Sequence, residues 1–199
     1  DQGHTEIDTL DWALNWTVRA ERSALAMNSR LTYGLKASQG GRWNRFAPKT
    51  HFLAALVQGQ YVRRMGSSGL ELSARLDLQW SDDPLFSAQR FALGGSGSVR
   101  DYRKNALLAD KGLMASLGLN YPLAAWDLRL RAFADYGYGR NVGQALIDNE
   151  MASLGLGVDW RINKAWDLSV SFAHAMIDRQ DKGGDPQDRG LHIALQAQF

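Results

Sequence analysis

Apolar and polar residues alternate along most of this chain, in segments of about ten residues. In the segment 70–80, LELSARLDLQW, every even-numbered position is apolar and every odd-numbered position is polar or charged. The same period of two occupies 8–19, 25–36, 51–62, 113–121, 126–138, 152–161, 166–172 and 191–199. Because successive side chains of a strand point to opposite faces, the pattern predicts an all-β fold of nine antiparallel strands.

The connections between these segments alternate in length along the chain. Short connections fall at 20–24, 64–69, 122–126 and 162–166, and long ones at 37–50, 81–111, 139–150 and 178–190. Short turns at one end and long loops at the other are typical of barrels that span the bacterial outer membrane. A barrel strand also needs only about ten residues to cross the bilayer, with its apolar residues at alternate positions.

A half-buried sheet of a soluble protein alternates as well, and two features favour the membrane over it. The polar faces carry charges and small residues on nearly every segment, as the wall of a water-filled lumen does. Aromatic residues also gather at the two ends of the segments: Tyr61, Tyr121, Trp126, Trp160, Trp166 and Phe199 near the short turns, and Trp12, Tyr33, Trp80, Tyr136 and Tyr138 toward the long loops. Two such belts are typical of a membrane-spanning sheet, so we predict an antiparallel transmembrane β-barrel in contact with outer-membrane lipid.

The number of predicted strands is odd, whereas bacterial single-chain barrels have an even number. An open sheet edge cannot face lipid, because its backbone groups would lose their hydrogen bonds. We therefore expect residues 1–199 to form the C-terminal part of a larger barrel. The remaining strands would come from the same polypeptide or from another chain. An aromatic residue such as Phe199 after an alternating strand also resembles the signal that outer-membrane assembly machinery reads.

Composition excludes several other functions. The net charge is +2 with both signs interspersed, which gives no basic face for nucleic acid. The chain has no cysteine and four histidines without metal-ligand spacing, so we expect no disulfide, no metal and no cofactor. The glycine-rich stretch GGSGSV, 94–99, lacks the Gly-Lys-Ser/Thr ending of a phosphate-binding loop.

An enzyme built on such a barrel is an alternative that would need a catalytic constellation near one rim. His174, Asp178 and Asp181 lie near the predicted long-loop end. However, the parity of the strand points His174 to the apolar face, toward lipid and away from any substrate. We therefore expect no enzyme and no catalytic residue.

The stretch RFALGGSGSVRDYRKN, 90–105, and the later FADYG, 133–137, carry a family resemblance. They resemble the Omp85 superfamily, and more narrowly the two-partner secretion transporters of the haemolysin-activation and filamentous-haemagglutinin exporter type. The matching positions are Gly94, Gly95, Val99, Arg100, Asp101 and Tyr102 in the loop, and Phe133, Asp135 and Gly137 on a later strand.

The resemblance implies a sixteen-stranded barrel, of which this chain would supply strands 8 to 16. The loop, about 83–110, would fold into the lumen, and the POTRA domains would lie outside this chain. The implied function is a pore that exports a large partner protein, unfolded, across the outer membrane. An Omp85-type insertase that assembles other barrels has the same loop motif and remains an alternative. A barrel with a plugged lumen, whose external loops bind ligands, is a third.

The resemblance further implies an ion pair between Arg100 and Asp135. Strand parity independently places Asp135 on the lumen face, whereas the residues alone leave open that Arg100 is a solvated loop charge. An arginine fork on a carboxylate would fix the loop on the wall with directional bonds. Asp101 departs from the family pattern, which has glycine there. Its carboxylate could compete for the Arg100 guanidinium and alter the tip.

Overall fold

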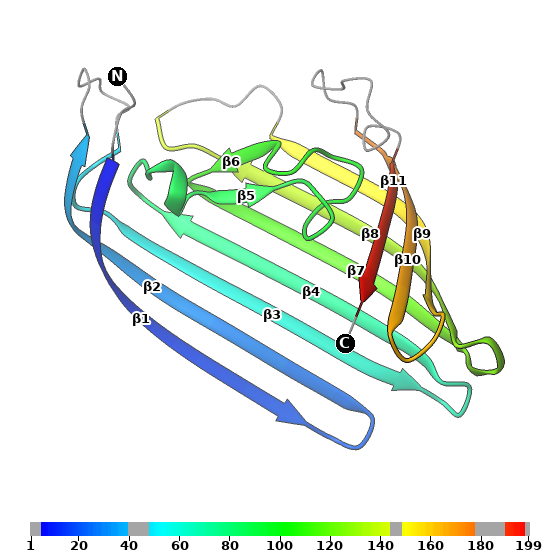
Figure 1. Cartoon of the computed structure of the whole chain (residues 1–199). Coiled ribbons are helices and arrows are strands. Elements are labelled where there is room, and N and C mark those ends of the chain that lie inside the picture. The colour runs from blue at the N-terminus through cyan, green and yellow to red at the C-terminus, as the bar shows by residue number, and fades with distance from the viewer. Residues whose placement is uncertain (1–4, 40–47, 144–148, 178–189, 198–199) are drawn as a thin grey trace.

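The computed structural model describes residues 5–39, 48–143, 149–177 and 190–197, and it is built from β-strands (Figure 1). Nine strands form one sheet and follow one another in chain order, each antiparallel to the next. These strands are β1 (Thr5–Arg19), β2 (Ser23–Gln39), β3 (Leu53–Met65), β4 (Leu70–Ser81), β7 (Lys111–Leu123), β8 (Leu128–Arg140), β9 (Glu150–Arg161), β10 (Trp166–Ala175) and β11 (Leu191–Ala197). The predicted all-β fold and its nine strands are therefore confirmed. No helix within the described ranges is long and apolar enough to cross a membrane.

Four shorter elements lie in the connections. The strands β5 (Phe91–Leu93) and β6 (Leu107–Ala109) pair only with each other, and the 3₁₀ turns η1 (Ser87–Gln89) and η2 (Ala124–Trp126) are one turn long. None of the four was predicted, because three residues are too few to show a period.

At the long-loop end, β1 and β2 are about three residues longer than the alternating segments 8–19 and 25–36 that predicted them. They pair from Thr5↔Gln39 to Arg19↔Ala24, with a register shift between Asp8 and Thr9. A bulge of this kind reverses the face on which the following side chains lie. The period of two therefore breaks at the bulge although the pairing continues past it.

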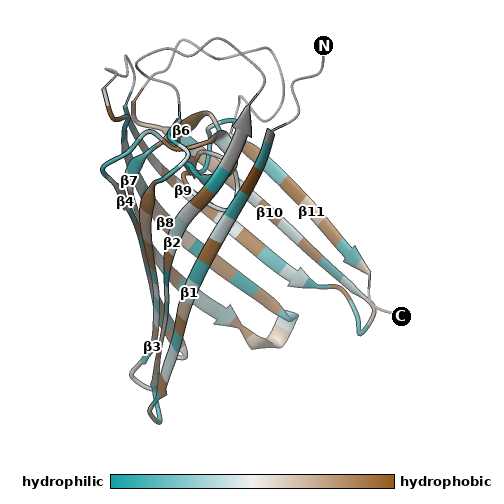
Figure 2. Cartoon of the chain, turned by 90° about the vertical axis from the view of Figure 1, so that its left-hand side faces the viewer, coloured by the Kyte–Doolittle hydropathy of each residue, from teal (hydrophilic) through white to brown (hydrophobic). Residues whose placement is uncertain are grey.

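Hydrophilic and hydrophobic residues alternate along the strands, as the bands of colour in Figure 2 show, and successive side chains lie on opposite faces of the sheet. On one face, large apolar side chains are exposed to a degree unusual in a soluble protein. Leu14 is 68% exposed, Leu156 66% and Ile193 65%. This face fits a hydrocarbon solvent, in which exposed leucine carries no penalty. The predicted alternation and the predicted difference in connection length are both confirmed.

The short turns are closed by local polar contacts. Asn163 Oδ1 accepts hydrogen bonds from the backbone N–H groups of Ala165 and Trp166, at 2.8 and 3.1 Å. Asp127 has a φ of 51°, which is a left-handed conformation that aspartate tolerates better than most residues. Phe199, predicted to end the last strand at this rim, lies outside the described residues.

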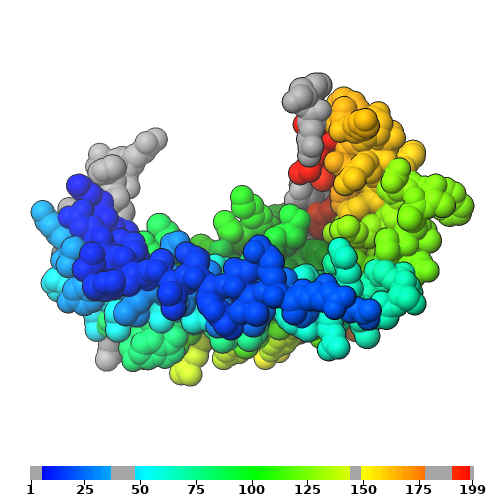
Figure 3. Space-filling model, turned by 90° about the horizontal axis from the view of Figure 1, so that it is seen from below, coloured from blue at the N-terminus to red at the C-terminus, as the bar shows by residue number. Residues whose placement is uncertain are grey.

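The sheet is curved into an open trough, and the connection between β4 and β7 lies within it (Figure 3). The larger cluster of buried apolar residues is located there, between this connection and the wall: Phe91, Leu93, Val99, Tyr102, Leu107, Met114, Met151 and Ala175. The core thus sits on the concave side and at the long-loop end. This placement brings the loop residues singled out above into contact with the strands.

Candidate functional site

The connection between β4 and β7, residues 82–110, is called the motif loop below. Its two arms pair as the hairpin β5–β6, from Phe91↔Ala109 to Leu93↔Leu107. The tip of the loop, residues 94–106, continues from this hairpin along the concave face of the sheet. The site is formed where the tip meets β7, β8, β9 and β10.

Two adjacent glycines allow the chain to leave β5 and enter the tip. Gly94 and Gly95 have φ angles of 99° and 96°, which side chains rarely adopt. A Cβ atom on Gly94 would also lie 2.3 Å from the carbonyl oxygen of Arg103. The Gly-Gly pair is therefore required by backbone geometry at the start of the tip.

The wall beneath the motif loop has glycines at three positions, which let the loop approach closely. A Cβ atom on Gly139 would lie 2.8 Å from the Cβ of Ala109, and one on Gly112 would lie 2.1 Å from the Phe91 ring. Gly137 is covered in the same way by Val99, which has no exposed surface. The position of the loop against β7 and β8 is thus set by steric fit as well as by charge.

Arg100 and Asp135 form a two-point ion pair between the tip and β8. Arg100 donates from Nε to Asp135 Oδ2 and from Nη2 to Oδ1, both at 2.6 Å. The backbone N–H of Arg100 donates to the same carboxylate at 3.2 Å. The Asp135 side chain has no exposed surface and that of Arg100 is 17% exposed. A buried carboxylate of this kind needs its partners, because its charge has no access to water.

Hydroxyl groups on the neighbouring strands complete the environment of Asp135. Ser116 on β7 and Ser153 on β9 lie directly opposite Asp135 in the sheet register. Ser116 donates to Asp135 Oδ1 at 2.7 Å, and Ser153 donates to Oδ2 at 3.4 Å. The carboxylate is therefore held by groups on both neighbouring strands as well as by the loop.

Phe133 supports the guanidinium from below. The Arg100 Cζ atom lies 3.3 Å from the centroid of the Phe133 ring, a distance that allows a cation–π interaction. Gly155 on β9 makes room for the ring, since a Cβ atom there would lie 2.2 Å from Phe133 Cζ. Phe133 and Asp135 share a face of β8 because they are two residues apart.

The next two tip residues contact different strands. Asp101 has a φ of 69°, and its Oδ2 accepts a hydrogen bond from the backbone N–H of Ala175 on β10. The carboxylate thus does not occupy the place where it would compete for Arg100. Tyr102 donates from its hydroxyl to the carbonyl of Ile177 at 2.7 Å and accepts from the N–H of Ala152 at 3.2 Å.

A second buried carboxylate, that of Asp110, binds the base of the motif loop. The sequence pattern did not predict this role. Its oxygens accept from the N–H of Leu85 at 2.9 Å, from Arg90 Nε at 3.2 Å and from the N–H of Val142 at 2.8 Å. Asp110 has no exposed surface. A lone aspartate at the start of a strand gives no sequence signal for this role.

β4, which pairs with β7 on the side away from β8, also contacts the tip. Arg75 pairs with Asp77 through Nη2 at 2.5 Å, and its Nη1 donates to the carbonyl of Gly97 at 2.9 Å. Gln58 on β3 donates to the same Asp77 carboxylate at 3.1 Å. The tip therefore has hydrogen-bond partners on both sides of the motif.

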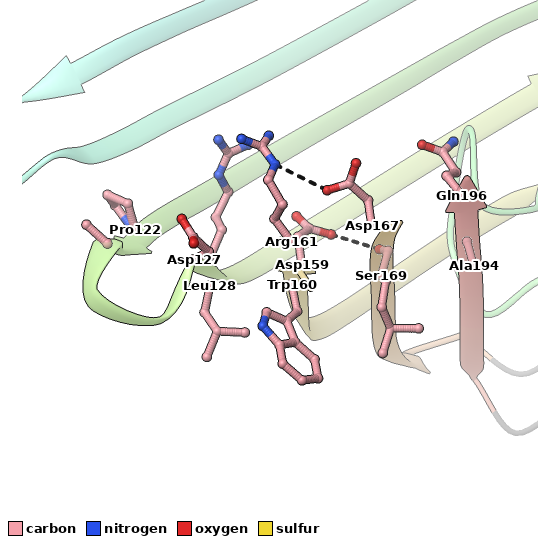
Figure 4. Close-up of a pocket in the computed structure, with 13 residues that line it drawn as sticks. Pro122, Asp127, Leu128, Asp159, Trp160, Arg161, Asp167, Ser169, Ala194 and Gln196 are labelled. Atoms are coloured by element: carbon pink, nitrogen blue, oxygen red, sulfur yellow. Dashed lines mark hydrogen bonds and ion pairs between the residues drawn. The ribbon is translucent and has the colours of Figure 1, made fainter. Parts of the chain in front are cut away.

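At the short-turn end the motif loop leaves the wall uncovered, and a groove of about 540 Å³ lies there. Figure 4 shows Arg161 and Asp167 on one side of the wall, and Leu128 and Trp160 pointing to the other. Arg161 pairs with Asp167 at 3.4 Å, and Ser169 donates to Asp159 at 2.8 Å. Charges of both signs alternate along this surface, so it selects no single kind of small ligand.

Of the three residues considered for the catalytic alternative, the structure describes one. His174 is exposed on the outer face beside Leu154, while Asp178 and Asp181 lie outside the described residues. Across the described ranges, no three His, Asp or Glu side chains come together in a group that would hold a metal ion.

Comparisons with known proteins give one family match and several matches of fold. A family model described as haemolysin secretion/activation protein ShlB/FhaC/HecB matches residues 3–160. No curated protein matches the sequence.

Three solved structures share the fold at low sequence identity. CdiB from Escherichia coli has a TM-score of 0.76 and 18% identity over 96% of this chain. CdiB from Acinetobacter baumannii has a TM-score of 0.57 and 11% identity over 98%. BamA from Haemophilus ducreyi lacking POTRA domains 1–3 has a TM-score of 0.65 and 13% identity over 95%. The chain spans 36% of the first structure and 42% of each of the other two.

Proposed function

The chain belongs to the ShlB/FhaC/HecB family of haemolysin secretion/activation proteins, and on this basis we propose that it forms part of the wall of a protein-export pore. It is a portion of a bacterial outer-membrane β-barrel, as its strand pattern predicted. The complete pore would pass a large partner protein, in an unfolded state, across the outer membrane. The chain would take part by shaping the lumen and would catalyse no reaction.

The observation that carries the proposal is the ion pair between Arg100 and Asp135. It lies on the lumen side and joins a loop that fills part of the trough to a wall strand. A loop held in this way sets how much of the lumen is open. At the short-turn end, where the loop leaves the wall uncovered, the wall has charges of both signs, which suits a polypeptide of varied sequence better than a small ligand.

The remaining parts of the proposal follow from the family. The other strands of a sixteen-stranded barrel and the POTRA domains would complete the protein, and the partner protein would be recognised outside this chain. Gly94, Gly95, Val99, Tyr102 and Gly137 would hold the loop in place. They would act through packing and hydrogen bonds, without a cofactor.

Export by the full-length protein tests the proposal. Arg100→Ala and Asp135→Ala should each reduce secretion of the partner protein by about tenfold or more, because each leaves a buried charge unpaired. Arg161→Ala is the matched control, because the Arg161–Asp167 pair lies on the same wall with side chains 69% and 40% exposed. Secretion is normalised to the amount of each variant assembled in the outer membrane. Normal secretion by both Arg100→Ala and Asp135→Ala would refute the proposed role.

The likeness to BamA keeps an insertase as the second candidate function. The two functions differ in which other proteins need this one to reach their final location. An exporter affects one large secreted partner, whereas an insertase affects the assembly of many other barrels. Depletion of the full-length protein followed by measurement of both quantities separates them. Loss of barrel assembly in general would favour the insertase.

A further inference from the structure

The two residues after Arg100 turn away from β8 and reach toward the last strands of the sheet. Asp101 contacts β10, and Tyr102 contacts β9 and the residue that follows the end of β10 by two positions. Arg100 itself contacts β7 through Ser116 Oγ, at 3.2 Å, and β8 through Asp135. Three consecutive tip residues thus bond to four consecutive wall strands.

The contact made by Asp101 is buried and specific. Asp101 Oδ2 lies 2.5 Å from the backbone nitrogen of Ala175, the last residue of β10. Asp101 is 9% exposed and Ala175 is 6% exposed. Removal of the carboxylate would leave this N–H group in a buried place without its acceptor, which is unfavourable.

The residue before β11 also packs closely against the Asp101 carboxylate. A Cβ atom on Gly190, the residue before β11, would lie 2.7 Å from Asp101 Oδ1 and 1.8 Å from the carbonyl oxygen of Ala173. The backbone N–H of Ala173 in turn donates to the carbonyl of Gly190 at 2.9 Å. The carboxylate therefore lies against the place where β10 and β11 come together at the long-loop end.

The backbone of Asp101 has the conformation that a glycine would adopt with less strain. Its φ of 69° is in the left-handed region, where aspartate and asparagine are the most tolerated residues with a side chain. An aspartate at this point of the tip thus keeps the bend of the chain. It also adds a hydrogen-bond acceptor that glycine lacks.

We infer that Asp101 is a positioning residue that fastens the tip of the motif loop to β10. The tip is then held from two directions, by Arg100 on β8 and by Asp101 on β10. Withdrawal of the loop from the wall must break both contacts, and it releases the long-loop ends of β9 and β10. The effect of this second contact on export rests on the proposed function, whereas the contact itself does not.

Thiol labelling of the full-length protein measures the contact directly. A single cysteine is introduced as Val99→Cys, at a position that is fully buried between the tip and Gly137, in protein without other cysteines. A water-soluble maleimide then reacts only when the tip leaves the wall. Ser96→Cys, at an exposed tip position, is the control reporter whose rate should be the same in all backgrounds.

Two substitutions of Asp101 distinguish the effect of losing the hydrogen-bond acceptor from the effect of changing the backbone conformation. Asp101→Asn tolerates the left-handed φ and keeps an oxygen that can accept from Ala175, so labelling at residue 99 should stay near the parent rate. Asp101→Gly tolerates the same φ but has no acceptor, and labelling should be about tenfold faster. If Asp101→Gly does not assemble, Asp101→Ala, which also lacks the acceptor and keeps the Cβ atom present in Asp101→Asn, is measured instead.

Equal labelling rates in the acceptor-containing and acceptor-free variants would overturn the inference. Faster labelling of the acceptor-free variant alone supports it. Export measured on the same variants distinguishes the two proposals. A loop that opens more often without any change in export would leave the role of Asp101 intact and contradict the proposed role of the loop in export.

Discussion

Val99 lies directly over Gly137, so closely that a Cβ atom added to the glycine would be 2.8 Å from Val99 Cγ2. The same added atom would be 3.2 Å from Leu93 Cδ2. Val99 and Leu93 are both fully buried by this contact. The motif loop therefore rests on the backbone of β8, two residues along the strand from the carboxylate that binds Arg100.

Gly137→Ala should displace the motif loop, because the methyl group takes space that Val99 occupies. Overpacking of this kind destabilises by about 1–3 kcal/mol. Labelling of the Ser98→Cys reporter, at a half-buried tip position, should become faster. Gly59→Ala on β3 is the control, since a Cβ there meets only the Leu76 carbonyl at 3.8 Å. Equal labelling in the two alanine variants would contradict the packing described for Gly137.

Asp110→Ala should destabilise the protein through the base of the loop. The change leaves Arg90 and the N–H groups of Leu85 and Val142 without their acceptor, at a cost of about 3–5 kcal/mol. Urea unfolding, followed by gel migration with and without heating, measures the loss. Asp82→Ala is the control, because Asp82 pairs with Lys111 at an exposed site and should change stability by less than about 1 kcal/mol. A loss no larger than the control's would show that Asp110 has no structural role.

Arginine should be far less tolerated on the outer face than on the inner face. Leu156→Arg, at a 66% exposed position near the middle of β9, should destabilise the folded barrel by about 2–4 kcal/mol in lipid bilayers. Ala26→Arg, at an exposed position on the opposite face of the sheet in β2, should change stability little, because its charge meets water and its cross-strand neighbours Thr17 and Gln60 are uncharged. Unfolding titrations of the two variants in vesicles give the comparison. A similar loss in both would contradict the assignment of the faces.

The strands were predictable because two solvents act on the two faces of the sheet. Lipid on one side and water on the other force a strict period of two, and each residue from Leu70 to Trp80 follows it. The same parity predicts that Asp135 lies on the lumen face. The alternation is interrupted at the bulge in β2, where Leu35 is an extra residue between the partners of Asp8 and Thr9.

The interior of the motif loop was not predictable in the same way. The strands β5 and β6 are three residues long, and their pairing depends on the glycines of the wall beneath them. Asp101 and Asp110 both bind backbone N–H groups distant in the sequence, and backbone groups are the same at every position. Neither partner could therefore be recognised from residue type.

Export by a charge-exchanged pair tests the central claim most directly. Arg100→Asp and Asp135→Arg each place like charges together in a buried contact, so each alone should abolish export by the full-length protein. The double variant Arg100→Asp/Asp135→Arg restores opposite charges and should recover part of the export, normalised to assembled protein. Normal export by both single variants, or a double variant no better than either one, would contradict the claim that this ion pair sets the position of the loop in the pore.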